Sequence, residues 1–259
     1  MLTVQPLPAF KDNYIWLLTR PGTRHAALVD PGDARPALAA LQRLGLEPCA
    51  VLVTHHHWDH TGGVAALRKQ YDAPVYGPAR EDIPALTHPL REGDVVDLPQ
   101  LGAALRVLDV PGHTRGAIAY YGADLLFCGD TLFTAGCGRL FEGTPRQMYA
   151  SLAKLAALPG ATQVYCGHEY TLENLAFARR VEPDNVDIMA RIRATEALRA
   201  RGLPSVPATL ETEQRTNPFL RCHDPDVIAA AENFAGRSLT DAAEVFAVVR
   251  HWKDVLDDD

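Results

Sequence analysis

Short apolar runs alternate with turns that contain Gly and Pro over the first two-thirds of the chain. Closely spaced strands and helices are typical of this pattern. The apolar runs predict strands at residues 14–19, 26–30, 50–54, 105–110, 117–121, 125–128 and 163–166. Helical spacing of apolar residues predicts helices at residues 34–44, 63–71, 145–157 and 172–180. Gly45 follows the first of these helices as a C-terminal stop.

The pattern changes after Pro183, where the periodic segments are helical. Helices are predicted at residues 186–201 and 238–254, joined by a Pro-containing connection over residues 202–225. We therefore expect a domain boundary near Glu182-Pro183, with residues 1–182 forming an α/β domain and residues 183–259 a helical domain.

Composition and charge narrow the choice of partners. The chain has 259 residues, 47% of them hydrophobic, and a net charge of −7, which disfavours nucleic acid and anionic membranes as partners. No run approaches the roughly 18 apolar residues that span a bilayer. Residues 1–12 lack the features of a secretion signal and suggest a strand, so we expect a cytoplasmic protein. No heptad pattern or partner surface is readable, and we expect a monomer.

Cysteine usage predicts reduced thiols. The five cysteines form no C-x-x-C pair, and their odd number argues against a complete disulfide framework. A structural zinc finger is excluded for the same reason.

The sequence THHHWDH over residues 54–60 follows the apolar run at residues 50–53. Side chains at i and i+2 of extended chain point the same way, so His55 and His57 can converge on one ion. After a turn, Asp59 and His60 can face a neighbouring site. His56 has the opposite parity, as does Trp58, and both are expected to be structural. The alternative is a solvent-exposed polar loop that happens to be rich in histidine.

Three more ligand-type residues follow predicted strands, and a glycine precedes each of them. They are His113, Asp130 and His168. Loops at strand ends carry functional groups on a rigid scaffold. Taken singly, each residue is better explained as a turn or capping residue, but the series together with THHHWDH predicts a catalytic metal site.

These motifs resemble the metallo-β-lactamase superfamily, whose pattern is T-H-x-H-x-D-H followed by a later His, Asp and His. More narrowly, the chain is similar to the glyoxalase II (hydroxyacylglutathione hydrolase) family. The similar stretches are FKDNY at residues 10–14, LDVPGHT at 108–114, GCGRLFEGT at 136–144, YCGHEYT at 165–171 and RTNP at 215–218.

The resemblance implies an α/β fold, an αββα sandwich of two mixed β-sheets flanked by helices, followed by a C-terminal α-helical domain. It also implies two divalent ions, with zinc expected and iron or manganese compatible with the same ligands. One ion would take His55, His57 and His113, and the other Asp59, His60 and His168, while Asp130 would bridge both. Asp59 and Asp130 would thereby act as catalytic residues as well as ligands.

The reaction implied is hydrolysis of a glutathione thioester, ideally S-D-lactoylglutathione, to D-lactate and glutathione. Two ions that share a water supply a hydroxide at neutral pH, and a thiolate leaves without strong acid help. The anionic substrate needs local cations, and the resemblance assigns Arg250 and Lys253 to the glutathione carboxylate. Arg139 and Tyr170 match two more positions of the substrate pocket. Some family members carry Lys and Tyr where this chain has Arg139 and Phe141, and Phe141 cannot donate a hydrogen bond.

Other functions fit parts of the pattern. A mononuclear iron persulfide dioxygenase uses a similar motif with three protein ligands, and the helical tail with Arg250 and Lys253 speaks against it. A β-lactamase or lactonase is a further alternative, and the pairing of Asp59 with His60 counts against the former. A non-catalytic binding module would not need all seven ligands. Without the resemblance, the basic pair would be taken for a solvated charged face.

Overall fold

The computed structural model of the chain describes residues 2–258. Contacts within the chain divide it into two compact units that interleave along the sequence. Unit 1 contains the residues up to Asp109, Thr114–Gly129 and Tyr165–Glu169. Unit 2 contains Val110–His113, Asp130–Val164 and the residues from Tyr170 onward.

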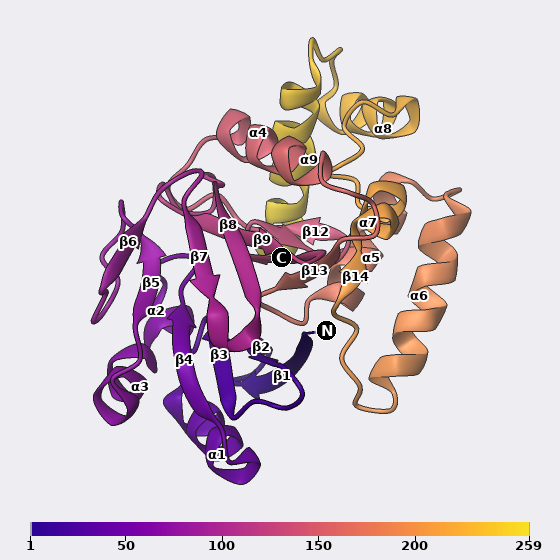
Figure 1. The fold of residues 1–259 in the computed structure, drawn as a ribbon. Coiled ribbons are helices and arrows are strands. Elements are labelled where there is room, and N and C mark those ends of the chain that lie inside the picture. Colours follow the sequence, from indigo (N-terminus) through magenta and orange to yellow (C-terminus); the bar gives the residue numbers. More distant parts are fainter. Residues whose placement is uncertain (1, 259) are drawn as a thin grey trace. The chain divides into compact units, whose positions relative to one another are not determined.

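Unit 1 is built around a mixed sheet of strands β1 to β6 in sequential order (Figure 1). Their bounds are Thr3–Ala9, Asn13–Thr19, His25–Val29, Glu47–Leu52, Val75–Pro78 and His88–Leu90. The pairs β1–β2 and β2–β3 are antiparallel, and those from β3 to β6 are parallel. In β2, Ile15, Trp16, Leu17 and Leu18 are all buried, so both faces of this strand are covered.

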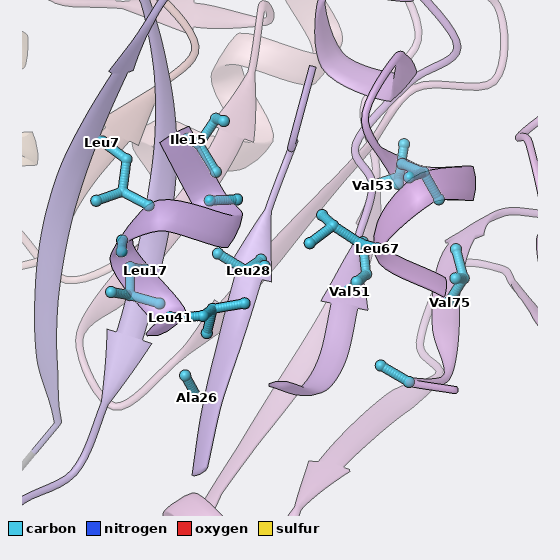
Figure 2. Close-up of a cluster of buried hydrophobic side chains, with 14 of the residues drawn as sticks. Leu7, Ile15, Leu17, Ala26, Leu28, Leu41, Val51, Val53, Leu67 and Val75 are labelled. Carbon is cyan, nitrogen blue, oxygen red and sulfur yellow. The ribbon is translucent and has the colours of Figure 1, made fainter. Parts of the chain in front are cut away.

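Helices α1 (Ala34–Leu44) and α3 (Val64–Tyr71) belong to the hydrophobic core on one face of this sheet. Figure 2 shows Leu41 of α1 and Leu67 of α3 beside strand residues such as Leu28 and Val51. The Asp33 carboxylate caps the start of α1, and Gly45 ends it in the left-handed conformation. The predicted helix 34–44 is therefore confirmed residue for residue.

A second group of strands in unit 1 pairs in the order β7–β8–β9–β10, all antiparallel. Their bounds are Val95–Leu98, Ala103–Asp109, Ile118–Gly122 and Leu125–Gly129, and the 3₁₀ turn Pro99–Leu101 joins β7 to β8. The Tyr120 hydroxyl of β9 donates to the Val53 carbonyl after β4 at 2.8 Å, and Trp16 of β2 donates to the Cys166 carbonyl at 2.9 Å. Unit 1 is therefore a sandwich in which two sheets face each other.

Unit 2 is mainly helical, with α4 and α8 both packed against α9 and α5 packed against α6 (Figure 1). Its helices α4 to α9 are Pro145–Ala156, Thr171–Val181, Val186–Arg199, Leu210–Thr216, Pro225–Ala235 and Ala242–Asp258. Its short strands are β11 (Leu132–Phe133), β12 (Gly136–Cys137) and β14 (Ala208–Thr209), which pairs with the first residues of β13 (Gln163–Cys166). The core includes stacked aromatic rings of Phe177 and Phe219.

Several elements differ from the sequence-based prediction. Strands β5, β6 and β7 were not predicted, because each is short and interrupted by Pro, Gly or a charged residue. The connection predicted over residues 202–225 contains α7, and α8 follows it. The last helix begins at Ala242 rather than at 238. The Asp241 side chain accepts from the Glu244 amide, and the Glu244 side chain accepts from the Thr240 amide, so these bonds cap the start of the helix.

No helix within residues 2–258 is long and apolar enough to cross a membrane.

Candidate metal centre

The THHHWDH segment occupies the loop after β4 and the short helix α2 (Trp58–Thr61) in unit 1. The His55 side chain is buried, and its ring centroid lies 4.8 Å from that of His57 and 4.2 Å from that of His60. Burial of His55 at the end of a buried strand gives the loop a fixed anchor. The rings of His55 and His57 therefore lie together, as expected from their alternate positions, and the His60 ring also lies beside that of His55.

Asp59, His60 and His168 bring three donor atoms together in unit 1. Asp59 Oδ2 lies 3.5 Å from His60 Nε2 and 3.4 Å from His168 Nε2. Asn13 donates to the same oxygen from its side chain at 3.0 Å and so holds the carboxylate in place. Two imidazole nitrogens and a carboxylate oxygen at this spacing form a group that can hold a divalent metal ion.

Carboxylates on the opposite side of the rings orient both histidines. His60 Nδ1 lies 3.0 Å from Asp30 Oδ2, and His168 Nδ1 lies 2.8 Å from Asp12 Oδ1. An ionised carboxylate only accepts, so each Nδ1 carries the proton and each Nε2 keeps its lone pair for a metal. This pairing of ligand histidines with carboxylates is usual at protein metal sites.

Asp30 lies within reach of His55 and His60 and could itself be counted among the ligands. Its oxygens, however, accept from the Thr54 amide at 2.8 Å and the Thr54 hydroxyl at 2.7 Å, besides contacting His60. We therefore assign Asp30 to orientation rather than to ligation. Because the Thr54 hydroxyl donates to Asp30, it accepts from His55 Nδ1 at 3.0 Å, so the lone pair of His55 Nε2 stays available to a metal.

Gly129 shows why glycine precedes a predicted ligand. Its φ is +50°, and a Cβ at this position would lie 2.2 Å from the Thr54 hydroxyl oxygen. A side chain here would both strain the backbone and displace the hydroxyl that orients His55. The glycine is thus required by the packing of β10 against the histidine loop.

In unit 2, His113 and Asp130 form a pair of their own. His113 Nε2 lies 3.5 Å from Asp130 Oδ2, and its Nδ1 donates to the Arg139 carbonyl at 2.9 Å. The ring is therefore oriented like those of His60 and His168, with Nε2 on the side of the acid. A Cβ at Gly138 would lie 2.0 Å from the Asp130 carbonyl oxygen, so this turn accepts no side chain.

Each unit thus brings its own predicted ligands together. In unit 1 these are His55, His57, Asp59, His60 and His168, and in unit 2 they are His113 and Asp130. All seven donors are imidazole or carboxylate, the set that suits a catalytic divalent metal.

The two remaining residues of the motif face elsewhere. The His56 amide donates to the Glu81 carboxylate at 2.6 Å, and the His56 ring lies 3.1 Å from the same oxygen. Glu81 also accepts from the Gly116 amide and the Thr114 hydroxyl, so it ties the histidine loop to the chain before β9. This role of His56 is structural, as expected. Trp58 instead leaves 69% of its surface exposed and contacts Phe10 edge-on.

The predicted basic residues meet in unit 2. Arg250 and Lys253 of α9 are both buried, and Arg139 lies with them. Arg250 Nη1 donates to the Cys137 carbonyl at 2.9 Å, and its Nη2 lies 2.9 Å from Asp254. Lys253 Nζ donates to Asp257 at 3.0 Å. The one-face arrangement expected from their spacing of three is therefore present, with acidic partners from the same helix.

Arg250 has hydrogen-bonding capacity that the described part of the chain does not use. Within residues 2–258, its buried Nε and Nη2 atoms have no hydrogen-bond acceptor of good geometry, although Nη2 is ion-paired with Asp254. Buried donors are nearly always satisfied in folded proteins. The two nitrogens form the side of the guanidinium group whose geometry matches a carboxylate with two parallel bonds.

The two aromatic positions of the predicted pocket also lie in unit 2. Tyr170 precedes α5, and its ring contacts that of Phe133 edge-on at 5.3 Å. Phe141 is exposed and lies 5.3 Å from the His113 ring. An exposed aromatic ring beside a predicted ligand is available to a substrate through apolar contact alone.

Sequence reasoning missed the acidic residues around both clusters, namely Asp12, Asp30, Glu81, Asp254 and Asp257. Asp30 follows a strand and precedes Pro31-Gly32, a signal like that of the predicted ligands. Asp254 and Asp257 stand four residues after Arg250 and Lys253, respectively, the spacing of helical ion pairs. Glu81 lies in a polar loop and has no comparable signal, whereas Asp12 belongs to the FKDNY stretch at residues 10–14 that resembles the family.

The chain matches known protein families along most of its length. Residues 10–168 match the family model of the metallo-beta-lactamase superfamily, and residues 169–256 match that of the hydroxyacylglutathione hydrolase C-terminus. The hydroxyacylglutathione hydrolase of Alkalilimnicola ehrlichii is 58% identical over 98% of this chain and 99% of its own. That of Nitrosomonas europaea is 52% identical over 98% and 96%, respectively.

Solved structures show the same fold. ETHE1 from Myxococcus xanthus is similar over 98% of this chain and 99% of its own, with a TM-score of 0.66 and 26% identity. The protein TTHA1623, solved in a di-iron-bound form, covers 84% of this chain at a TM-score of 0.57 and 31% identity. The expected sandwich of two sheets flanked by helices, followed by a helical domain, is confirmed. The chain belongs to the hydroxyacylglutathione hydrolase family within the metallo-beta-lactamase superfamily.

Proposed function

We propose that the protein is a metal-dependent thioesterase that hydrolyses S-D-lactoylglutathione to D-lactate and glutathione. The observation that carries this proposal is the similarity, along nearly the whole chain, to proteins named hydroxyacylglutathione hydrolase. The match to the C-terminal family model includes Arg250 and Lys253, the residues proposed to grip the substrate. These relatives do not favour the alternatives of a persulfide dioxygenase, a β-lactamase or a lactonase.

Seven residues would hold two divalent ions, which we propose to be zinc. His55, His57 and His113 would bind one ion, and Asp59, His60 and His168 the other, with Asp130 shared between them. Support comes from the superfamily pattern and from the donor chemistry, because in His55, His60, His113 and His168 the Nδ1 atom is already committed to a hydrogen bond. Their Nε2 atoms are the available ligands.

When bound, the two ions would lower the pKa of a water molecule towards neutrality and withdraw charge from the thioester carbonyl. The chain's own contribution is orientation. Asp12 and Asp30 hold the imidazoles against rotation, and Asn13 holds Asp59. The oxygens of Asp59 and Asp130 would take part directly, as ligands next to the reacting water. The glutathione thiolate is a good leaving group, so no residue needs to act as a strong acid.

Arg250 and Lys253, with Arg139 and Tyr170, would hold the glutathione moiety. Arg250 supports this role because its buried Nε and Nη2 atoms form no hydrogen bond of good geometry with the described residues, although Nη2 is ion-paired with Asp254. In the proposed domain arrangement, residues 1–182 form the catalytic domain with the metal ligands. Residues 183–259 form the helical domain with Arg250 and Lys253. Cytoplasmic location and a monomeric state remain predictions from the sequence.

The direct test is to incubate the purified, metal-loaded protein with S-D-lactoylglutathione and to follow the loss of thioester absorbance. We expect turnover that disappears on treatment with a chelator and returns when zinc is added. Metal analysis of the same preparation should give two ions per chain. Absence of thioester turnover, together with sulfite formation from glutathione persulfide, would falsify the proposal in favour of the dioxygenase.

A further inference from the structure

Three cations of unit 2 contact one carboxylate from the last turn of α9. Asp257 lies in the last turn of α9, four residues after Lys253. Its oxygens are 3.0 and 3.1 Å from Lys253 Nζ, and Asp257 Oδ2 is 3.7 Å from Arg250 Nη2 and 3.8 Å from Arg139 Nη2. One carboxylate therefore contacts all three cations.

Asp254 has a different position in the same cluster. It contacts the two guanidinium groups, at 2.9 Å for Arg250 and 3.8 Å for Arg139, whereas the ion pair of Lys253 within residues 2–258 is with Asp257. Lys253 is buried and thus depends on Asp257 for its charge partner. Asp257 is the acid placed where a ligand carboxylate would meet all three cations.

The basic and acidic side chains of this cluster also differ in how far they are exposed to solvent. The Arg250 and Lys253 side chains are only 2% and 9% exposed, whereas the Asp257 side chain is 35% exposed. Buried cations are held by their surroundings, while a half-exposed acid on a terminal turn can move into water at little cost. The cations form a fixed receptor, and Asp257 is the movable partner.

We propose that Asp257 is an internal competitor of the substrate. Its carboxylate occupies the place among Arg139, Arg250 and Lys253 that a carboxylate of the glutathione moiety takes, and the substrate must displace it. The proposal rests on the proposed function, in which these cations bind the substrate. Asp257 therefore weakens substrate binding while it compensates the buried charges of the substrate-free protein.

The alternative role for Asp257 is to hold the cations in position for the substrate. The two roles predict opposite effects of removing its charge. For a competitor, Asp257→Asn leaves the cations unmatched and improves binding of an anionic ligand. For a residue that positions Lys253, the same change lets the ammonium group move and weakens binding.

The experiment compares wild type, Asp257→Asn and Asp257→Glu, with Asp97→Asn on the exposed side of β7 as a control for net charge. The KM and kcat for S-D-lactoylglutathione are measured, and the binding of glutathione itself is measured by calorimetry. For Asp257→Asn we expect KM and the glutathione Kd to fall about fivefold, as one partly exposed charge contact permits. We expect kcat to stay the same within about twofold, since a weaker competitor changes binding rather than chemistry. Asp257→Glu keeps the charge and should resemble wild type, as should Asp97→Asn.

An unchanged or raised KM in Asp257→Asn, with an unchanged or raised glutathione Kd, overturns the competitor role while the proposed function stands. Absence of thioester turnover in wild type is a failure of the proposed function instead. The calorimetric arm still decides in that case, because tighter glutathione binding by Asp257→Asn supports competition, and equal, weaker or undetectable binding refutes it.

Discussion

Unit 1 gathers four histidines, and unit 2 gathers three cations, Arg139, Arg250 and Lys253. The carboxylates that contact these two clusters lie on different sides of the nitrogens that would bind a ligand. In unit 1, Asp30 is buried and Asp12 contacts its histidine from the side opposite the donor atom Nε2. In unit 2, Asp254 and Asp257 contact the same nitrogens that a ligand would use. A carboxylate that contacts the ring nitrogen opposite Nε2 orients the imidazole before a metal binds. A carboxylate that contacts the ligand-binding nitrogen itself must be displaced by the ligand.

This difference predicts that changes in unit 1 and at Asp130 affect metal and rate together, and that changes in the cation cluster affect binding alone. The two regions can be tested separately, because their expected readouts differ. Metal content and kcat report on the first, and KM reports on the second.

The largest effect is expected for Asp130→Ala. Loss of a carboxylate that we propose to be shared by two ions should lower metal content and kcat together, by at least about a hundredfold in rate, since even the partners of ligands contribute roughly 10–100-fold. Metal analysis and thioester turnover measure the change, with Asp97→Ala as a surface control. A variant that keeps both ions and full activity would show that Asp130 is not a ligand.

Asp12→Ala should have the next largest effect, through His168. Without an acceptor on Nδ1 the ring can rotate or change tautomer, and metal affinity should fall roughly 10–100-fold. Asp12→Asn keeps an oxygen acceptor and should lose much less metal affinity. The comparison of the two variants therefore distinguishes the orienting role of Asp12 from the effect of its charge. Competition with a chelating dye gives the affinity, and the exposed Asp82→Ala serves as control. Equal affinity of Asp12→Ala and wild type would remove Asp12 from the centre.

Lys253→Ala and Arg250→Ala should each raise KM by about tenfold, the size expected for a lost hydrogen bond to a charged group. The kcat should change little, because both residues are proposed to hold a part of the substrate that does not react. Initial rates over a range of S-D-lactoylglutathione concentrations give both constants. A large fall in kcat at unchanged KM would mean that these cations take part in the chemistry.

Most of the fold that positions the centre was predictable because it depends on local patterns. The apolar run before THHHWDH and the spacing of 34–44 gave β4 and α1 to within a few residues. Helix α8 was missed although Asp224 and Pro225 form an ordinary helix start. Its apolar residues include three successive alanines, which give a weak signal of one buried face.

The candidate site was predictable where the residue type alone identifies the chemistry. The series of histidines and Asp130 at predicted strand ends, taken together with THHHWDH, indicates a metal site before the fold is known. Asp12 could not be found in this way, because its partner His168 is 156 positions away in the sequence and only the tertiary structure brings them together. Asp257 was readable as a helical partner of Lys253, but its contacts with Arg139 depend on the packing of α9.

The smallest expected effect concerns Cys137, whose carbonyl accepts from Arg250. Burial raises the pKa of its thiol from 9.0 to about 11, although nearby Arg250 opposes the shift. The folded state therefore favours the neutral thiol. This stabilisation is complete below the unfolded pKa and is lost as pH rises from 9.0 towards about 11.

Between pH 8.5 and 10.5, urea unfolding should show wild type losing about 1–2 kcal/mol more stability than Cys137→Ala, where one pKa unit corresponds to about 1.4 kcal/mol. Tyr120, whose pKa burial also raises, is common to both proteins and cancels in the comparison. The pKa of Cys222 is raised first by burial and then by Cys137, so loss of Cys137 removes only the smaller cause there. Parallel pH profiles would show that Cys137 ionises as readily in the folded chain as in the unfolded one, and that the cations beside it offset its burial.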